Sequence, residues 1–113
     1  MKHKIKKTEN EIMSRNWDHL SGTAWAMLLC KQPRFAAKCD WSKLSGIDWA
    51  MLLVKQTCFA YKCDWSKFGG REWTYLLSEC PQFAEKCDWS TINGHQWEIL
   101  ICAHPEFNEK LYR

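Results

Sequence analysis

The chain repeats itself every 24 residues without a gap, and this period restricts its fold more than any other feature. The copies span 15–38, 39–62, 63–86 and 87–110, and they are called units 1 to 4 below. Six of the 24 positions hold the same residue in all four units: two Trp and one each of Gly, Leu, Phe and Lys. Units of this length cannot bury an apolar face alone and must stack on their neighbours. The period therefore predicts an array with one continuous interior.

Each unit has the pattern of two helices of unequal length. Its seventh position holds Ser, Ser, Gly and Asn in units 1 to 4, residues that are preferred at a helix N-cap. A first helix is predicted over 46–56 in unit 2, where Trp49, Leu52 and Leu53 form a one-sided apolar stripe. Proline at the nineteenth position of units 1, 3 and 4 ends this helix and begins a shorter second one. The repeated Gly at the eighth position costs helix stability, and two reasons for it stay open: a Cβ would collide, or φ must be positive.

No segment alternates apolar and polar residues at the period of two that a half-buried strand requires. We predict an all-α fold, a right-handed α-solenoid-like array of four 24-residue two-helix repeats with a short N-terminal capping helix. Residues 8–113 form this single repeat domain after a basic flexible tail over 1–7. Within it, 8–14 form the cap, which begins with the capping-box pattern Thr8-Glu9-Asn10-Glu11, and 111–113 cover the last open face. Because that cover is thin, self-association through the ends of the array is a further expectation.

The repeated apolar side chains are predicted to form the core, because aromatic residues dominate buried area. They recur at four positions of every unit, as a loop Trp, a helix Trp, a helix Leu and a Phe in the second helix. These predicted core residues are Trp17, Trp25, Leu28, Phe35, Trp41, Trp49, Leu52, Phe59, Trp65, Trp73, Leu76, Phe83, Trp89, Trp97, Leu100 and Phe107.

The positive charge of the chain is concentrated in its first seven residues. The formal net charge is +3, and four positive charges come from Lys2, Lys4, Lys6 and Lys7. The remaining 106 residues carry 12 basic and 13 acidic side chains. A nucleic-acid binder shows a basic excess on its folded surface, so binding of nucleic acid through these lysines and exposed aromatic residues is the less favoured alternative. No apolar run is long enough to span a bilayer or to form a signal peptide, which predicts a cytoplasmic protein without a membrane partner.

The cysteine and histidine residues do not have the spacing of a metal site. Cys39, Cys63 and Cys87 are one position of the unit seen three times, and Cys102 with His104 lacks a second pair. We interpret the cysteines as packed thiols and predict no metal and no other cofactor. No His recurs beside a Ser or Cys, and no phosphate-binding glycine loop is present, so we predict that the chain is not an enzyme.

Residues that differ between the units are the candidates for binding a protein partner. In an array, constant positions hold the fold and variable positions are free to carry specificity. The ninth, thirteenth and sixteenth positions share one side of the first helix. Stacking would align the thirteenth residues into a row of Met, Met, Tyr and Ile, and Met next to Tyr is typical of binding surfaces, unless this row packs against the next unit. The predicted partner-binding residues are Thr23, Met27, Arg34, Ile47, Met51, Arg71, Tyr75, His95 and Ile99.

The repeated motif Trp-Ser-x-Leu-x-Gly-x-x-Trp-x-x-Leu-Leu-x-x-x-Pro-x-Phe-x-x-Lys-Cys-Asp-Trp resembles tandem repeats in uncharacterised proteins of gut bacteria and their mobile elements. The resemblance covers 15–110 and implies a small scaffold without catalytic residues. Three functions follow: a protein-protein interaction module, which we favour, a phage or mobile-element inhibitor of a host defence complex (an anti-CRISPR-like role), and the nucleic-acid binder described above.

Overall fold

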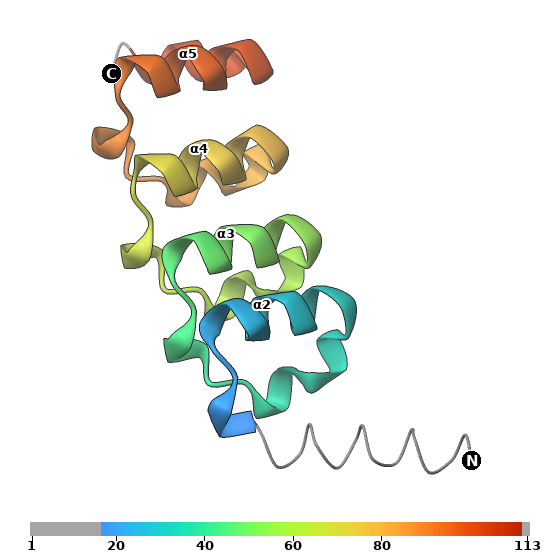
Figure 1. Ribbon diagram of the computed structural model, residues 1–113. Coiled ribbons are helices and arrows are strands. Elements are labelled where there is room, and N and C mark those ends of the chain that lie inside the picture. The colour runs from blue at the N-terminus through green and yellow to red at the C-terminus, as the bar shows by residue number, and fades with distance from the viewer. Residues whose placement is uncertain (1–16, 112–113) are drawn as a thin grey trace, which may run out of the picture.

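A computed structural model describes residues 17–111 and confirms the all-helical repeat array (Figure 1). Each unit contributes one α-helix of 10 residues: α2 (Gly22–Lys31), α3 (Gly46–Lys55), α4 (Gly70–Glu79) and α5 (Gly94–Ala103). Each α-helix packs on the next in chain order, so units 1 and 4 lie at opposite ends of the array. The predicted tail over 1–7, the predicted cap over 8–14 and the last two residues of the predicted cover lie outside the described residues.

The α-helices begin where the N-cap pattern predicts. In unit 2, Ser45 Oγ accepts a hydrogen bond from the Asp48 backbone N–H at 3.3 Å, and Asp48 Oδ2 accepts one from the Ser45 N–H at 3.0 Å. Unit 3 has only half of this arrangement, because Gly69 has no side chain and Glu72 Oε1 alone accepts the Gly69 N–H, at 2.8 Å. These bonds satisfy donors that the first turn of a helix leaves unpaired.

The predicted short second helix of each unit is present, and it is a 3₁₀-helix. These segments are η2 (Pro33–Lys38), η4 (Thr57–Lys62), η6 (Pro81–Lys86) and η8 (Pro105–Phe107), which continues into α6 (Asn108–Leu111). Short helical segments that connect longer elements commonly take this tighter form. Proline is not essential for the break, because Gln56 before Thr57 has φ −134° and ψ 76°, close to the −137° and 73° of Gln32 before Pro33.

A short 3₁₀ turn joins successive units: η1 (Trp17–His19), η3 (Trp41–Lys43), η5 (Trp65–Lys67) and η7 (Trp89–Thr91). Asp40 caps η3, because its Oδ1 accepts hydrogen bonds from the Ser42 backbone N–H at 3.2 Å and from Ser42 Oγ at 2.6 Å. The Ser42 hydroxyl holds the pKa of Asp40 below its ordinary value, and the hydroxyl of Ser66 does the same for Asp64. These exposed carboxylates therefore act as caps of the 3₁₀ turns.

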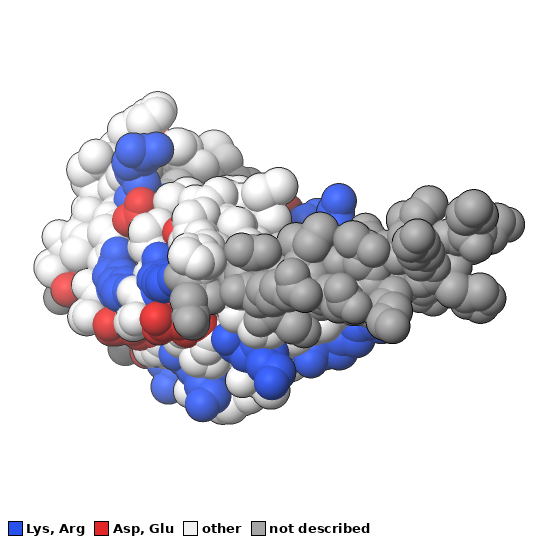
Figure 2. All heavy atoms as spheres, turned by 60° about the horizontal axis from the view of Figure 1, so that its bottom comes forward, with Lys and Arg blue, Asp and Glu red and all other residues white. Residues whose placement is uncertain are grey.

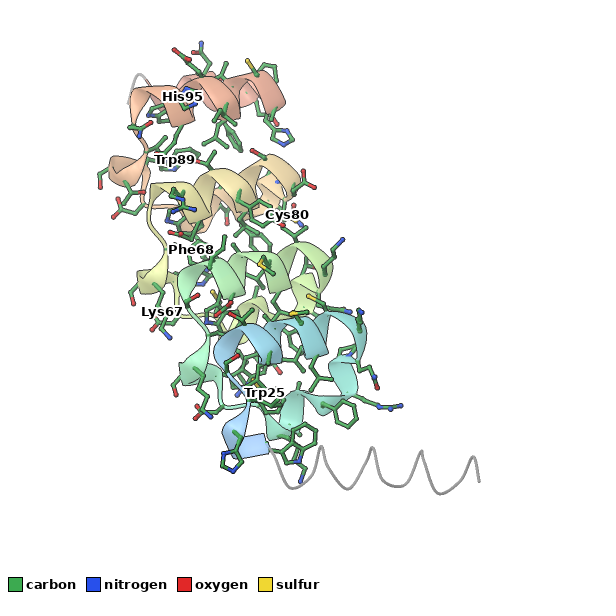
Figure 3. All side chains as sticks on the ribbon, viewed as in Figure 1. Trp25, Lys67, Phe68, Cys80, Trp89 and His95 are labelled. Carbon is green, nitrogen blue, oxygen red and sulfur yellow. The ribbon has the colours of Figure 1, made fainter. Side chains whose placement is uncertain are left out.

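Half of the predicted core residues are buried and the other half are partly buried against them. In each unit the loop Trp stacks on the helix Trp, with ring centroids 5.1 to 5.4 Å apart. Figure 3 shows Trp25 inside the first unit and Phe68 between α3 and α4. The predicted list omitted two further sets of buried residues, from the sixth and fifteenth positions: Leu29, Leu44, Leu53, Phe68, Leu77 and Ile92.

The repeated glycine is explained by close approach of the next unit. None of the described glycines has a positive φ. A Cβ on Gly22, Gly46 or Gly70 would collide with a backbone carbonyl oxygen of the following 3₁₀ turn, whereas no described residue lies within 4 Å of a Cβ on Gly94. Lys67 stabilises the junction of units 2 and 3, because its Nζ donates to the backbone carbonyl oxygens of Ser42 at 3.0 Å and Leu44 at 2.7 Å. Of the two explanations left open, steric collision is the correct one.

Candidate functional site

The thirteenth position of the unit lies on the surface of the array. Its residues are exposed in three units, as Met27, Tyr75 and Ile99, and half-buried in unit 2, as Met51. The residue at the twelfth position packs against the next unit instead, because Ala26 and Ala50 are 0% exposed. In unit 4 the residue at the same position, Glu98, is exposed. The row of variable residues is therefore accessible along most of its length.

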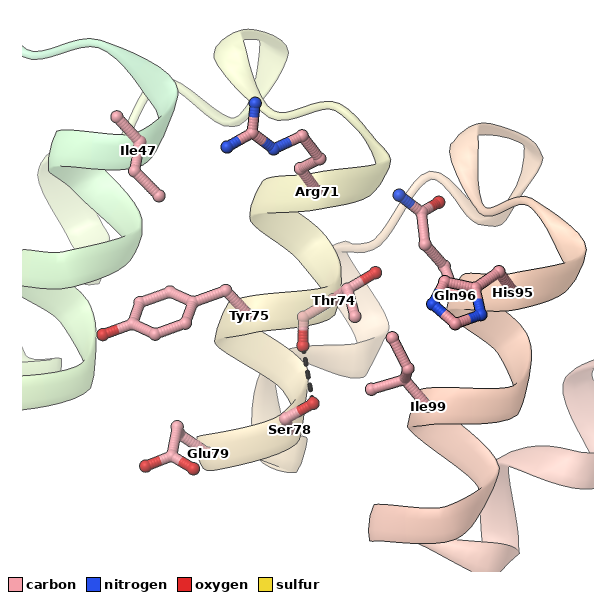
Figure 4. Close-up of a pocket in the computed structure, with 9 residues that line it drawn as sticks. All are labelled: Ile47, Arg71, Thr74, Tyr75, Ser78, Glu79, His95, Gln96 and Ile99. Atoms are coloured by element: carbon pink, nitrogen blue, oxygen red, sulfur yellow. Dashed lines mark hydrogen bonds between the residues drawn. The ribbon is translucent and has the colours of Figure 1, made fainter.

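A groove of about 530 Å³ lies across α4, between α3 and α5 (Figure 4). Tyr75 points from α4 toward α3, while Thr74 and Ser78 face α5. The groove is lined by Ile47, Arg71, Thr74, Tyr75, Ser78, Glu79, His95, Gln96 and Ile99.

Five of the nine predicted partner-binding residues come together in this groove: Ile47, Arg71, Tyr75, His95 and Ile99. The other four do not line it. Of these, Thr23 is engaged inside the array, because its Oγ1 donates to Asp48 Oδ1 of the next unit at 2.9 Å. Arg34 is held locally, with its guanidinium 2.8 Å from Gln32 Oε1 and above the Phe35 ring.

Two small hydroxyl side chains leave the groove open. Thr74 Oγ1 donates to the Gly70 carbonyl oxygen at 2.6 Å, and Ser78 Oγ donates to the Thr74 carbonyl oxygen at 2.7 Å. Both hydroxyls are satisfied by their own helix and need no partner from α5. Ser78 takes the place of the larger Val54 of unit 2. Their variation between units was the available signal for these residues, but the amount of space beside them cannot be read from the sequence.

The walls of the groove are apolar and its two ends carry opposite charge. Ile47, Tyr75 and Ile99 are each between 40% and 42% exposed, which is unusual for large apolar side chains. Arg71 lies in the first turn of α4 and Glu79 is its last residue. Both side chains are exposed, and neither forms an ion pair with another described residue. The groove therefore offers an apolar floor between a cation and an anion.

Hydrogen bonds between neighbouring units hold the junctions of the array. Gln56 Nε2 donates to the Cys30 oxygen of the preceding unit at 3.0 Å, and His104 Nε2 lies 3.0 Å from the Ser78 oxygen in the equivalent place. Asp48, which is 4% exposed, accepts from Thr23 of unit 1 as well as from its own N-cap residue. The His104 contact joins units 3 and 4 beside the groove, whereas the Gln56 and Thr23 bonds join units 1 and 2.

Among residues 17–111, no three His, Cys, Asp or Glu side chains gather as they would around a metal ion. No helix in that part of the chain has the length and apolar character needed to cross a membrane. All seven cysteines are free thiols, and Cys58 and Cys102 are the exposed ones. Burial raises the pKa of Cys39 to about 11 and the pKa values of Cys63 and Cys87 to about 12, with the adjacent aspartate adding to each shift.

These pKa values predict two classes of cysteine reactivity. A thiol reagent such as iodoacetamide attacks the thiolate, so Cys58 and Cys102 should be modified first at pH 8, and Cys39, Cys63 and Cys87 only on unfolding. Mass spectrometry of labelled peptides tests the order of reaction, and equal labelling of all sites would contradict it.

The raised pKa values also predict a loss of stability at high pH. An unfolded cysteine ionises near pH 9, while the folded cysteines stay protonated up to pH 11 or 12. The free energy of unfolding should therefore fall as the pH rises between those values.

Comparison with protein-family models, curated proteins and solved structures gave no match for this chain.

Proposed function

We propose that this chain is a non-enzymatic protein-protein interaction module that holds an extended segment of its partner in the groove across α4. The convergence of five variable residues in one groove supports this proposal most strongly. Constant residues form the interior and variable residues line the groove, as expected where specificity is separated from folding. We place the protein in the cytoplasm, because free thiols throughout a small domain are typical of a reducing compartment.

The two ends of the groove define the chemistry of the segment. Arg71 and Glu79 are eight residues apart on α4, which corresponds to about 12 Å along the helix axis. An extended peptide covers that length in about four residues. The complementary segment therefore has an acidic residue opposite Arg71, a large apolar residue over Tyr75, and a basic residue opposite Glu79. Charges placed in this way fix the direction and register of the partner.

A random peptide library displayed on phage tests this function directly. Selection on the immobilised full chain should enrich peptides with an acidic and a basic residue about four positions apart and a large apolar residue between them. Selection on Arg71→Glu should replace the acidic residue of the consensus by a basic one, and Tyr75→Ala should lower the affinity of the wild-type peptides about tenfold or more.

Tyr61→Ala is the matched control, because Tyr61 is 75% exposed and does not line the groove. This variant should bind the selected peptides as the wild type does. A consensus unchanged by Arg71→Glu, or no enrichment at all, would contradict the groove proposal. Selective binding of an oligonucleotide with a steep loss of affinity in salt would favour the nucleic-acid alternative instead.

A further inference from the structure

The last glycine of the repeat has no role within the described structure. At the three inner positions, a backbone carbonyl of the following unit rests against the glycine and excludes any side chain. Gly94 begins α5 in the same way, is exposed, and has nothing within 4 Å of its virtual Cβ. Glycine at the start of a helix costs stability relative to alanine. The space beside Gly94 is therefore open, whereas the equivalent space at the inner glycines is occupied by the 3₁₀ turn of the following unit.

Side-chain size is reversed between the two ends of the array. Inside it, position 12 is small and buried, as in Ala26 and Ala50, and position 10 of the next unit carries a polar side chain such as Asp48. At the ends, position 10 of unit 1 is Ala24 and position 12 of unit 4 is Glu98. Unit 1 thus lacks a polar side chain at position 10, and unit 4 carries a carboxylate at position 12, where the other units have Ala or Thr.

The Glu98 side chain lies beside position 9 of its unit, the position that contacts the next unit at the junction of units 1 and 2. Glu98 Oε2 is 3.9 Å from His95 Nδ1, and His95 occupies position 9 of unit 4. At the junction of units 1 and 2, position 9 is Thr23, which donates to Asp48 of the following unit at 2.9 Å. Glu98 therefore extends toward the place where the carboxylate of a following unit would lie. Opposite Ala24 it would supply the acceptor that the N-cap of α2 does not obtain from its own position 10.

The net charge of the units falls steadily along the array. Units 1 to 4 have net charges of +3, +1, −1 and −3. The basic side chains number four, three, three and one in these units, and the acidic side chains number one, two, four and four. Figure 2, with the N-terminal end turned toward the viewer, shows several groups of Lys and Arg together with a row of Asp and Glu on that face. The opposite net charges of units 1 and 4 are nevertheless electrostatically complementary.

We propose that copies of this chain associate head to tail, with the C-terminal face of unit 4 of one copy stacked on the N-terminal face of unit 1 of the next. The carbonyl of the η1 turn would rest on Gly94, and Glu98 would fill the space beside Ala24. The contact is weaker than the junctions inside the chain, because the exposed Asn108 replaces the half-buried alanine found at position 22 of the other units. Such a heterologous contact extends to open chains of copies unless its rotation closes a ring.

Sedimentation equilibrium of the full chain, from micromolar to millimolar concentration, tests this association. The average mass should rise with concentration beyond that of a dimer, and it should fall when salt screens the complementary ends. Gly94→Ala, which no described residue opposes, should fold normally and lower the association constant about tenfold or more. Glu98→Lys should have a similar effect.

Glu106→Lys is the matched control for charge, because Glu106 is in the same unit, at a position that is exposed in all four units. It alters the net charge as Glu98→Lys does and should leave association at least tenfold stronger than Glu98→Lys does. A chain that stays monomeric at every concentration would overturn the proposal and leave the N-terminal face to residues 1–16. Equal weakening by Glu98→Lys and Glu106→Lys, or association unaffected by Gly94→Ala, would overturn it as well.

Discussion

Trp49→Ala is expected to lower the free energy of unfolding by about 3–5 kcal/mol, the range for removal of a buried aromatic side chain. Trp49 is 1% exposed and stacks on Trp41 with 5.2 Å between ring centroids. Unit 2 has a neighbour on each side, so loss of the Trp49 side chain weakens two interfaces of the array. Urea denaturation followed by circular dichroism measures the effect, and an unchanged midpoint would show that this side chain is not part of the core.

Two further variants separate packing from polar effects at this position. The Nε1 atoms of Trp25, Trp49 and Trp73 are buried without a hydrogen-bond partner among the described residues. Trp49→Phe removes one such donor and keeps an aromatic ring, so it should cost clearly less than Trp49→Ala. Trp97→Ala should also cost less, because Trp97 is only half-buried in a unit with a single neighbour. Equal losses for all three variants would contradict the nearest-neighbour account.

Gly46→Ala and Gly94→Ala are expected to change stability in opposite directions, although the two glycines are equivalent in the repeat. A Cβ at Gly46 collides with the Lys67 carbonyl oxygen, and overpacking of this kind costs about 1–3 kcal/mol. At Gly94 the Cβ meets nothing, so the variant should gain up to about 1 kcal/mol from helix propensity. Thermal melts at low protein concentration, where copies do not associate, measure both changes.

Two other outcomes would contradict this explanation of the repeated glycine. If Gly94→Ala destabilised the chain as much as Gly46→Ala, the residue would be needed for a reason internal to each helix. If Gly46→Ala were neutral, the units would be more widely spaced than the structure shows. Gly22→Ala serves as a second inner position, because its Cβ meets the Lys43 carbonyl in the same way.

The period and the capping residues were sufficient to predict the array, because both act locally or between adjacent units. Ser45 and Asp48 cap α3 as their spacing indicates, and α3 spans Gly46–Lys55 against a predicted 46–56. The 3₁₀ character of the second helix could not be predicted, because the pattern indicated only a short second helix and a segment of that length can be either α or 3₁₀. In unit 4, Asn108 is helical and α6 follows η8.

The groove was only partly predictable for a similar reason. Variation between units indicated Arg71, Tyr75 and Ile99, but a helix turns by about 100° per residue, and the sequence did not decide which variable position faces the next unit. The structure shows that position 12 does, through Ala26 and Ala50. The small size of these residues was the signal that could have settled the question. Glu79 and Gln96 were missed because their place in the groove depends on the separation of α4 and α5.

The central claim is that the tryptophans form the interior and leave the variable residues to act on the outside. Tryptophan fluorescence with acrylamide quenching tests it most directly, because Trp25, Trp49 and Trp73 are almost fully buried and the other tryptophans are half-buried. The native chain should emit at shorter wavelength than the unfolded chain and should be quenched much less. Emission and quenching equal to those of the unfolded chain would contradict the claim and would make the aromatic residues the working surface.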